Sequence, residues 1–189
     1  SLAAYNGHLT CLQVLRNFEA PWEETVLTMA AKDGNLDILR FALSNDCPCR
    51  DSTTLLQAVV HSGMNVVPCL SYLVDTLSLE MTPELFCVAL ERGDVETVSY
   101  LVDGCCPCVY FAARRNLKIG TEASVLACIE YALGHGCTCP DDLLDWVVEN
   151  KFETCAQCIR EFLQHPEYSG PDGKLYHQLV VNFVVMYLI

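Results

Sequence analysis

The sequence predicts an all-α protein, a helical-repeat solenoid of about six degenerate helix-turn-helix units. Three observations predict it: an apolar column that recurs at nearly constant spacing, a glycine five residues before several of its members, and proline-containing turns between copies. A period of roughly 20 to 50 residues is typical of repeat folds. Because one such unit cannot bury its own apolar side, we expect neighbouring units to stack.

The apolar column marks the second helix of each unit. Its members are separated by 27, 31, 28, 31 and 30 residues, which is too regular for chance. Gly7, Gly34 and Gly93 precede three of them, because glycine readily adopts the left-handed conformation that a tight helix-helix turn needs. Asn116 takes this place in the fifth unit, and asparagine is the next-best residue there. The column comprises Leu12, Leu39, Leu70, Val98, Ile129 and Ile159.

Small apolar pairs and proline turns bound the predicted helices. Pairs such as Ala30-Ala31 end the first helix of a unit, where small residues let two helices approach closely. Turns such as Cys47-Pro48-Cys49 separate one unit from the next. The predicted first helices span 24–33, 53–62, 83–92, 108–116 and 141–150, and the predicted second helices span 8–17, 36–45, 67–77, 95–103, 122–135 and 153–164.

The pattern divides the chain into a repeat array over 1–165, a turn or linker over 166–174 and an apolar segment over 175–189. The last segment is shorter than the roughly 20 residues that span a bilayer. We interpret it as a capping helix or a segment docked on a partner, with a truncated membrane helix as the alternative. The first residues resemble neither a signal peptide nor a transit peptide and lie in mid-repeat, so we expect a larger chain or assembly.

The net charge limits the classes of partner, and the cysteine content indicates the redox state of the compartment. The formal charge of −13, from 24 acidic and 11 basic residues, would repel a phosphate backbone and argues against nucleic acid. The 13 cysteines are an odd number at a density below that of disulfide scaffolds. We therefore expect reduced thiols in an intracellular reducing compartment, with cytoplasm or nucleus favoured over an organelle.

Residues 3–15, Ala-Ala-Tyr-Asn-Gly-His-Leu-Thr-Cys-Leu-Gln-Val-Leu, and the segment Asp46-Cys47-Pro48-Cys49 resemble the ankyrin repeat superfamily. The resemblance is to its divergent branch with Gly-Cys-Pro-Trp-like loops, common in protists and giant viruses, and covers nearly 1–165. The family's Thr-Pro-Leu-His opening is absent. The resemblance implies a recognition module that binds proteins through turn tips and exposed faces of first helices.

On that implied surface, tryptophan, tyrosine and arginine are the residue types that most often anchor interfaces. Trp22 has an equally weighted alternative, in which it packs between units, and Trp146 is predicted to be core. The candidate partner-binding residues are Trp22, Glu23, Arg50, Asp51, Tyr110, Arg114 and Arg115.

The Cys-x-Cys pairs at 47/49, 106/108 and 137/139 raise zinc binding or redox chemistry as an alternative function. A tetrahedral site needs its sulfurs within about 4 Å of one another, whereas equivalent positions of stacked helices lie about 10 Å apart. We therefore predict that one cysteine of each loop fills the gap between units.

Other residue pairs are also interpreted as structural. Cys155 and Cys158 lack the βαβ context of a redox motif, and His8 with Cys11 lacks an orienting third group. The remaining histidines lie near helix ends, where imidazoles bond carbonyls. The sequence thus predicts a non-enzymatic scaffold or adaptor, including a peripheral subunit of an assembly, with no catalytic, cofactor or metal site.

Overall fold

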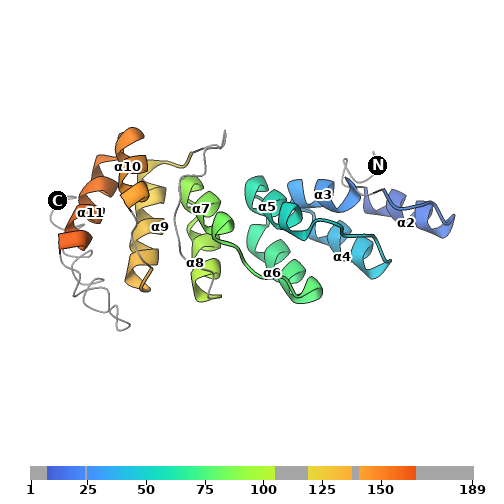
Figure 1. Cartoon of the computed structure of the whole chain (residues 1–189). Coiled ribbons are helices and arrows are strands. Elements are labelled where there is room, and N and C mark those ends of the chain that lie inside the picture. Colours follow the sequence, from blue (N-terminus) through green and yellow to red (C-terminus); the bar gives the residue numbers. More distant parts are fainter. Residues whose placement is uncertain (1–7, 24, 105–118, 138–140, 165–189) are drawn as a thin grey trace. The chain divides into compact units, whose positions relative to one another are not determined.

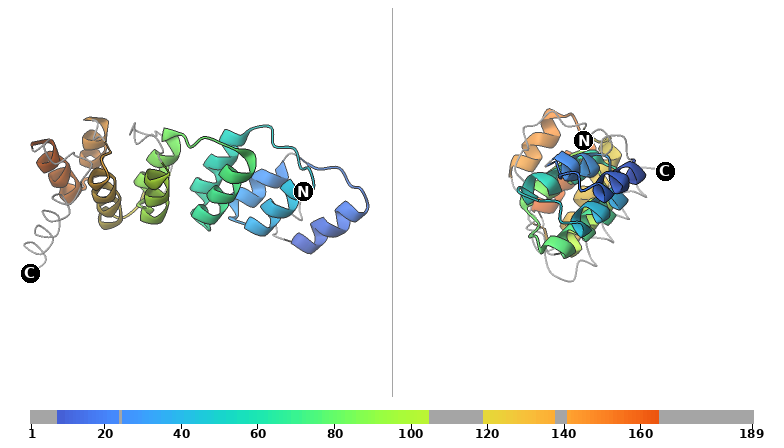
Figure 2. Two further views of the ribbon diagram at one scale, coloured as in Figure 1. Left: turned by 90° about the horizontal axis from the view of Figure 1, so that it is seen from below. Right: turned by 90° about the vertical axis from the view of Figure 1, so that its right-hand side faces the viewer.

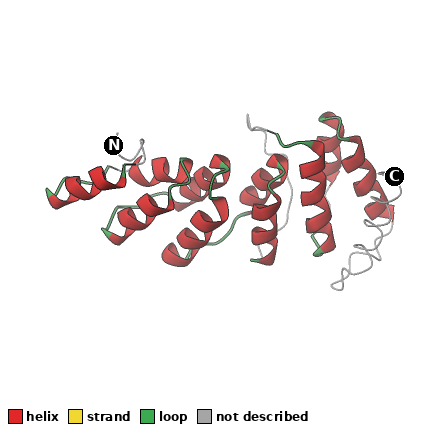
Figure 3. Ribbon diagram, turned by 180° about the vertical axis from the view of Figure 1, so that it is seen from behind, coloured by secondary structure: helices red, strands yellow, loops and turns green. Residues whose placement is uncertain are grey.

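The structure is a computed structural model that describes residues 8–23, 25–104, 119–137 and 141–164. Ten helices lie in these residues, which hold no strand (Figure 1; Figure 3). The chain forms two compact units, Ser1–Glu80 and Met81–Ile189. The all-α, helical-repeat prediction is therefore confirmed for the described residues.

The helix bounds follow the predicted ranges to within one residue wherever both can be compared. The predicted helix 108–116, the linker 166–174 and the apolar segment 175–189 lie outside the described residues. No described helix is both long and apolar enough to cross a membrane. Unit 1 contains α2 (Leu9–Asn17), α3 (Thr25–Lys32), α4 (Leu36–Ser44), α5 (Ser52–Ser62) and α6 (Val66–Leu77), and unit 2 contains α7 (Pro83–Arg92), α8 (Val95–Asp103), α9 (Glu122–Gly134), α10 (Asp141–Glu149) and α11 (Glu153–Gln164).

Each unit is built from helical hairpins that stack side by side. In unit 1, α3 packs on α4 and α5 on α6, while α3 lies beside α5 and α4 lies between α2 and α6 (Figure 1; Figure 2). In unit 2, α7 packs on α8 and α10 on α11, and α9 lies between α8 and α11. First helices therefore form one layer of unit 1 and second helices the other.

The core lies between these layers and contains the residues that the repeat pattern singled out. Every member of the apolar column is at most 3% exposed. The small pair Ala30-Ala31 at the end of α3 is fully buried, as is Val59-Val60 of α5. Because these side chains are short, the first helices can pack closely against their neighbours.

The turn inside each hairpin ends one helix and begins the next. Gly34 adopts a φ of 60°, and the Asn35 N–H donates to the Ala30 carbonyl at 2.8 Å, which is a Schellman-type cap. The Asn35 side chain then accepts from the Ile38 N–H at 3.1 Å and caps α4. Gly93 and Asp94 repeat this arrangement between α7 and α8.

The turns between hairpins end their helices with the same Schellman-type cap, but most of them do not have glycine at the left-handed position. Each of four second helices is followed by a residue at positive φ and then by an N–H that donates to the carbonyl five residues back. Only one of these positions is a glycine, so the glycine pattern did not predict them. The positive-φ residues are Glu19, Asp46, Ser78 and Gly136.

Turns of neighbouring hairpins contact each other directly. The Asn65 side-chain amide donates to the Gly34 carbonyl at 3.0 Å, and a Cβ added to Gly34 would overlap the Met64 carbonyl. In unit 2, the Gly120 N–H donates to the Glu91 carbonyl at 2.9 Å. Glycine at residue 34 is therefore required for two reasons, the left-handed backbone and the close approach of the next turn.

A left-handed backbone costs an L-residue about 1–2 kcal/mol. Replacement of Gly34 by alanine is expected to destabilise unit 1 by more than this, because the added Cβ also overlaps the Met64 carbonyl. Gly136→Ala is the matched control, because Gly136 has a φ of 83° but nothing within 4 Å of an added Cβ. Thermal and urea unfolding of both variants check this. If both variants lose the same stability, the contact between Gly34 and the Met64 carbonyl does not contribute to it.

Candidate functional site

The described candidate residues lie on two adjacent loops of unit 1. Trp22 joins these loops: its Nε1–H donates to the Asn45 carbonyl at 2.7 Å, and its ring meets Phe41 edge to face at 6.2 Å. The Arg16 guanidinium carbon lies 4.9 Å from the centre of the same ring. Trp22 is only partly buried, so it packs between repeats and still presents part of its ring to solvent.

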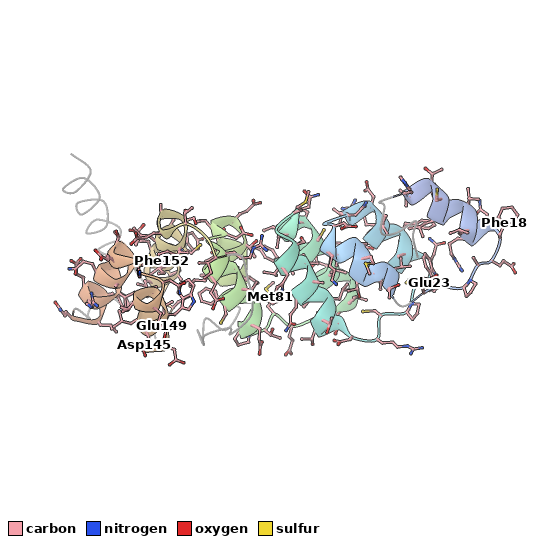
Figure 4. All side chains as sticks on the ribbon, turned by 90° about the horizontal axis from the view of Figure 1, so that it is seen from above. Phe18, Glu23, Met81, Asp145, Glu149 and Phe152 are labelled. Carbon is pink, nitrogen blue, oxygen red and sulfur yellow. The ribbon has the colours of Figure 1, made fainter. Side chains whose placement is uncertain are left out.

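Glu23, which is labelled in Figure 4, is exposed on the first of these loops, and Arg50 and Asp51 are exposed on the second. Asp51 also caps α5, because its carboxylate accepts from the Thr54 hydroxyl at 2.6 Å and from the Thr54 N–H at 2.9 Å. These hydrogen bonds, that of the hydroxyl foremost, hold the pKa of Asp51 below its usual value. The segment Asp51-Ser-Thr-Thr carries this capping signal in the sequence, which the binding prediction did not use.

The other candidates, Tyr110, Arg114 and Arg115, lie outside the described residues. Trp146 is 9% exposed and meets Phe152 edge to face at 5.8 Å, as the core prediction expects. The described part of the predicted surface is therefore the pair of loops in unit 1.

The exposed faces of first helices are largely polar. Thr25 and Lys32 are exposed on α3, and Thr53 is exposed on α5. On α10 the exposed side chains are mainly acidic and include Asp145 and Glu149 (Figure 4). Faces of this kind offer polar and charged groups rather than a hydrophobic patch.

Cysteines of the inter-hairpin loops are packing residues where the structure describes them. Cys47 is 5% exposed and Cys137 is 7% exposed, each just after the positive-φ residue, while Cys49 is half-buried. This confirms the gap-filling prediction for Cys47 and Cys137. Cys106, Cys108 and Cys139 lie outside the described residues.

Burial makes several thiols poor nucleophiles. Desolvation, helped by neighbouring Cys49, raises the pKa of Cys47 to about 11. Desolvation raises the pKa of both Cys128 and Cys155 to about 12, with smaller contributions from Asp94 and Glu122 respectively. These three thiols are therefore protonated at neutral pH, whereas redox or metal chemistry requires the thiolate.

The remaining chemical candidates are packing or surface groups. Cys155 is fully buried, whereas Cys11 and His8 are exposed. Two histidines bond helix carbonyls as expected: the Nδ1 of His61 lies 2.6 Å from the Gln57 oxygen, and that of His135 lies 2.7 Å from the Tyr131 oxygen. Within the described ranges, no group of three or more His, Cys, Asp or Glu could hold a metal ion.

Sequence reasoning missed an apolar surface on α2. Val14 is 48% exposed, Leu15 is 43% exposed and Phe18 is 81% exposed. The sequence analysis assigned only Leu12 of this helix to the apolar column, and among the helix residues only Leu12 is buried. The spacing identifies an apolar stripe, but it does not reveal whether another helix covers it.

Comparison with known proteins identifies the repeats of unit 1. Residues 1–83 match the family model for ankyrin repeats, in three copies. Neither the search of curated proteins nor that of solved structures found a match. The matched range includes the two loops that carry Trp22 and Arg50.

Substitution of Trp22 by phenylalanine is expected to lower the stability of unit 1 by about 1 kcal/mol, because the Asn45 carbonyl loses its donor while most of the aromatic packing remains. Urea unfolding measures the change. Phe18→Ala is the control, with a change below about 0.5 kcal/mol, since this ring is 81% exposed. An unaffected Trp22→Phe variant would show that the hydrogen bond is not made in solution.

The stability of unit 2 is expected to fall as the pH rises from 9.0 to about 12. Cys128 and Cys155 have raised pKa values in the folded state, so they stabilise it fully below the unfolded value of 9.0, and this contribution is lost as the pH rises toward 12. Urea unfolding at several pH values measures the slope. Cys128→Ala should reduce it, and Cys11→Ala, at an exposed cysteine, should leave it unchanged.

Proposed function

We propose that this chain, whose residues 1–83 match the ankyrin-repeat family, acts as a protein-binding scaffold or adaptor, as a peripheral subunit of a larger assembly. Ankyrin repeats are protein–protein interaction modules and are typically non-enzymatic. The observation that carries the proposal is the set of three ankyrin repeats in residues 1–83. Their loops carry the partly exposed ring of Trp22 and exposed charges of both signs.

Trp22 is well suited to anchor a partner. Tryptophan and arginine dominate the binding energy of many interfaces. Because the Asn45 carbonyl and the Arg16 guanidinium already hold the Trp22 ring, little side-chain entropy is lost when a partner covers its exposed part. Glu23 follows Trp22 in the first loop and Arg50 lies in the second, and these exposed charges would fix the orientation of the partner.

The chemistry of the chain favours a protein partner over nucleic acid. The formal charge of −13 opposes a phosphate backbone. Acidic residues such as Asp142, Asp145 and Glu149 extend this charge over the exposed side of α10. We place the protein in a reducing compartment, cytoplasm or nucleus, because its many cysteines fit a thiol-reducing environment.

The alternative, a thiol-redox or zinc protein, receives little support from the described cysteines. Cys47, Cys128 and Cys155 have raised pKa values, so a thiolate ligand or nucleophile is costly to form at these positions. No group of metal-binding residues occurs in the part of the chain that the structure describes. In the described residues, Cys47 and Cys137 are better explained as buried thiols that directly follow a hairpin cap.

Affinity capture of the tagged protein, with mass spectrometry and metal quantification in the same preparation, tests the proposal. Stoichiometric protein partners without bound metal would support a scaffold. A protein that is recovered alone and carries zinc would support the alternative instead.

Charge reversal on the two loops is expected to weaken capture of the partner. The double variant Glu23→Lys/Arg50→Glu should reduce recovery of the partner by roughly tenfold while the thermal midpoint stays near that of the parent, since both side chains are exposed. Asp75→Lys is the matched control, because this exposed carboxylate lies on second helix α6. If the double variant and the control capture the partner equally, the two loops are not the binding surface.

A further inference from the structure

Glu122 joins α9 to α11 through two hydrogen bonds. Its carboxylate accepts from the Thr154 N–H at 2.6 Å, and its backbone carbonyl accepts from the Cys155 thiol at 3.6 Å. Glu122 lies in the first turn of α9, while Thr154 and Cys155 lie in the first turn of α11. One residue therefore holds both the backbone and a side chain at the beginning of the neighbouring helix.

The turn that precedes α11 explains why this contact is needed. In the α3–α4 and α7–α8 hairpins a left-handed glycine is followed by Asn35 or Asp94, whose side chain caps the second helix. In the α10–α11 turn Lys151 is the left-handed residue, so Phe152 occupies the equivalent place. A phenylalanine side chain cannot accept a hydrogen bond. Glu122 supplies the missing capping oxygen from another helix.

The charge of Glu122 strengthens this cap. A carboxylate that accepts from a backbone N–H makes a charge-assisted hydrogen bond, which is stronger than a bond between neutral groups. Negative charge is also favourable in the first turn of a helix, and Glu122 lies at this end of α9 while it bonds the same end of α11. Loss of this carboxylate therefore weakens the attachment of α11 to α9.

Two buried thiols lie on the helices that Glu122 joins. Cys128 of α9 and Cys155 of α11 are both 0% exposed, and α11 packs on α9 (Figure 1). Burial, Asp94 and Cys155, in that order, raise the pKa of Cys128, so Cys155 lies within electrostatic range of it. Separation of α11 from α9 would therefore expose both thiols in one event.

We propose that Glu122 is a latch: its hydrogen bonds to the beginning of α11 hold this helix on α9 and keep Cys128 and Cys155 inaccessible to soft electrophiles and disulfides. Proteins open locally at a lower free energy than that of global unfolding. When the latch is released, the α9–α11 interface opens more often while α7 and α8 stay folded. The open state then presents two neighbouring thiols that the closed state conceals.

Alkylation of the buried cysteines tests the latch. The protein is reacted with N-ethylmaleimide under native conditions, and the labelled peptides are quantified by mass spectrometry. In Glu122→Ala, Cys128 and Cys155 should react at least about fivefold faster than in the parent, and by the same factor, because labelling follows the population of the open state. Cys87 of α7, which is also 0% exposed, should be unchanged. Glu96→Ala is the matched control, because Glu96 is an exposed acid in the first turn of α8.

The pattern of labelling decides the outcome. Unchanged rates at both thiols in Glu122→Ala would overturn the proposal, as would acceleration of only one of them. An equal acceleration at Cys87 would also overturn it, since this indicates general destabilisation of unit 2. Glu122→Gln keeps an acceptor oxygen without the charge, so its rates should fall between those of the parent and the alanine variant.

Discussion

The left-handed residue that follows a helix is the constraint on which the rest of the structure depends. It reverses the chain within two residues and brings the next N–H back to a helix carbonyl, so one short turn ends a helix and satisfies carbonyls of its last turn. At Gly34 the absence of a Cβ also leaves room for the Met64 carbonyl of the next hairpin. Tight turns therefore permit close stacking, and close stacking buries the apolar column.

This construction leaves loops and outer helix faces available, and ankyrin repeats are generally protein–protein interaction modules. The interior is filled by side chains of neighbouring hairpins, and the buried Cys128 and Cys155 take part in that packing with raised pKa values. The loops and outer helix faces carry little of the core and can vary without loss of the fold. Trp22 belongs to both regions, since it ties two loops together and keeps part of its ring in solvent.

Candidate surfaces were harder to predict than helices. Asp51 was predicted as a binding residue from its place at a turn tip, but the structure also makes it the cap of α5. The indole of Trp22 was equally compatible with packing and with binding, because only the position of the Asn45 carbonyl decides whether its N–H is satisfied. The exposed stripe on α2 has the same spacing as buried stripes elsewhere, so its exposure depends on which helices lie around it.

The sequence by itself determined the helical period, the helix bounds, the turn glycines and the buried column, because each depends on local conformational preference or on repeated apolar spacing. Only the tertiary structure decided the roles of Glu19, Asp46 and Ser78, which occupy left-handed positions against their own preference. It also decided which apolar faces are covered. Both depend on contacts between neighbouring hairpins, which local preference does not encode.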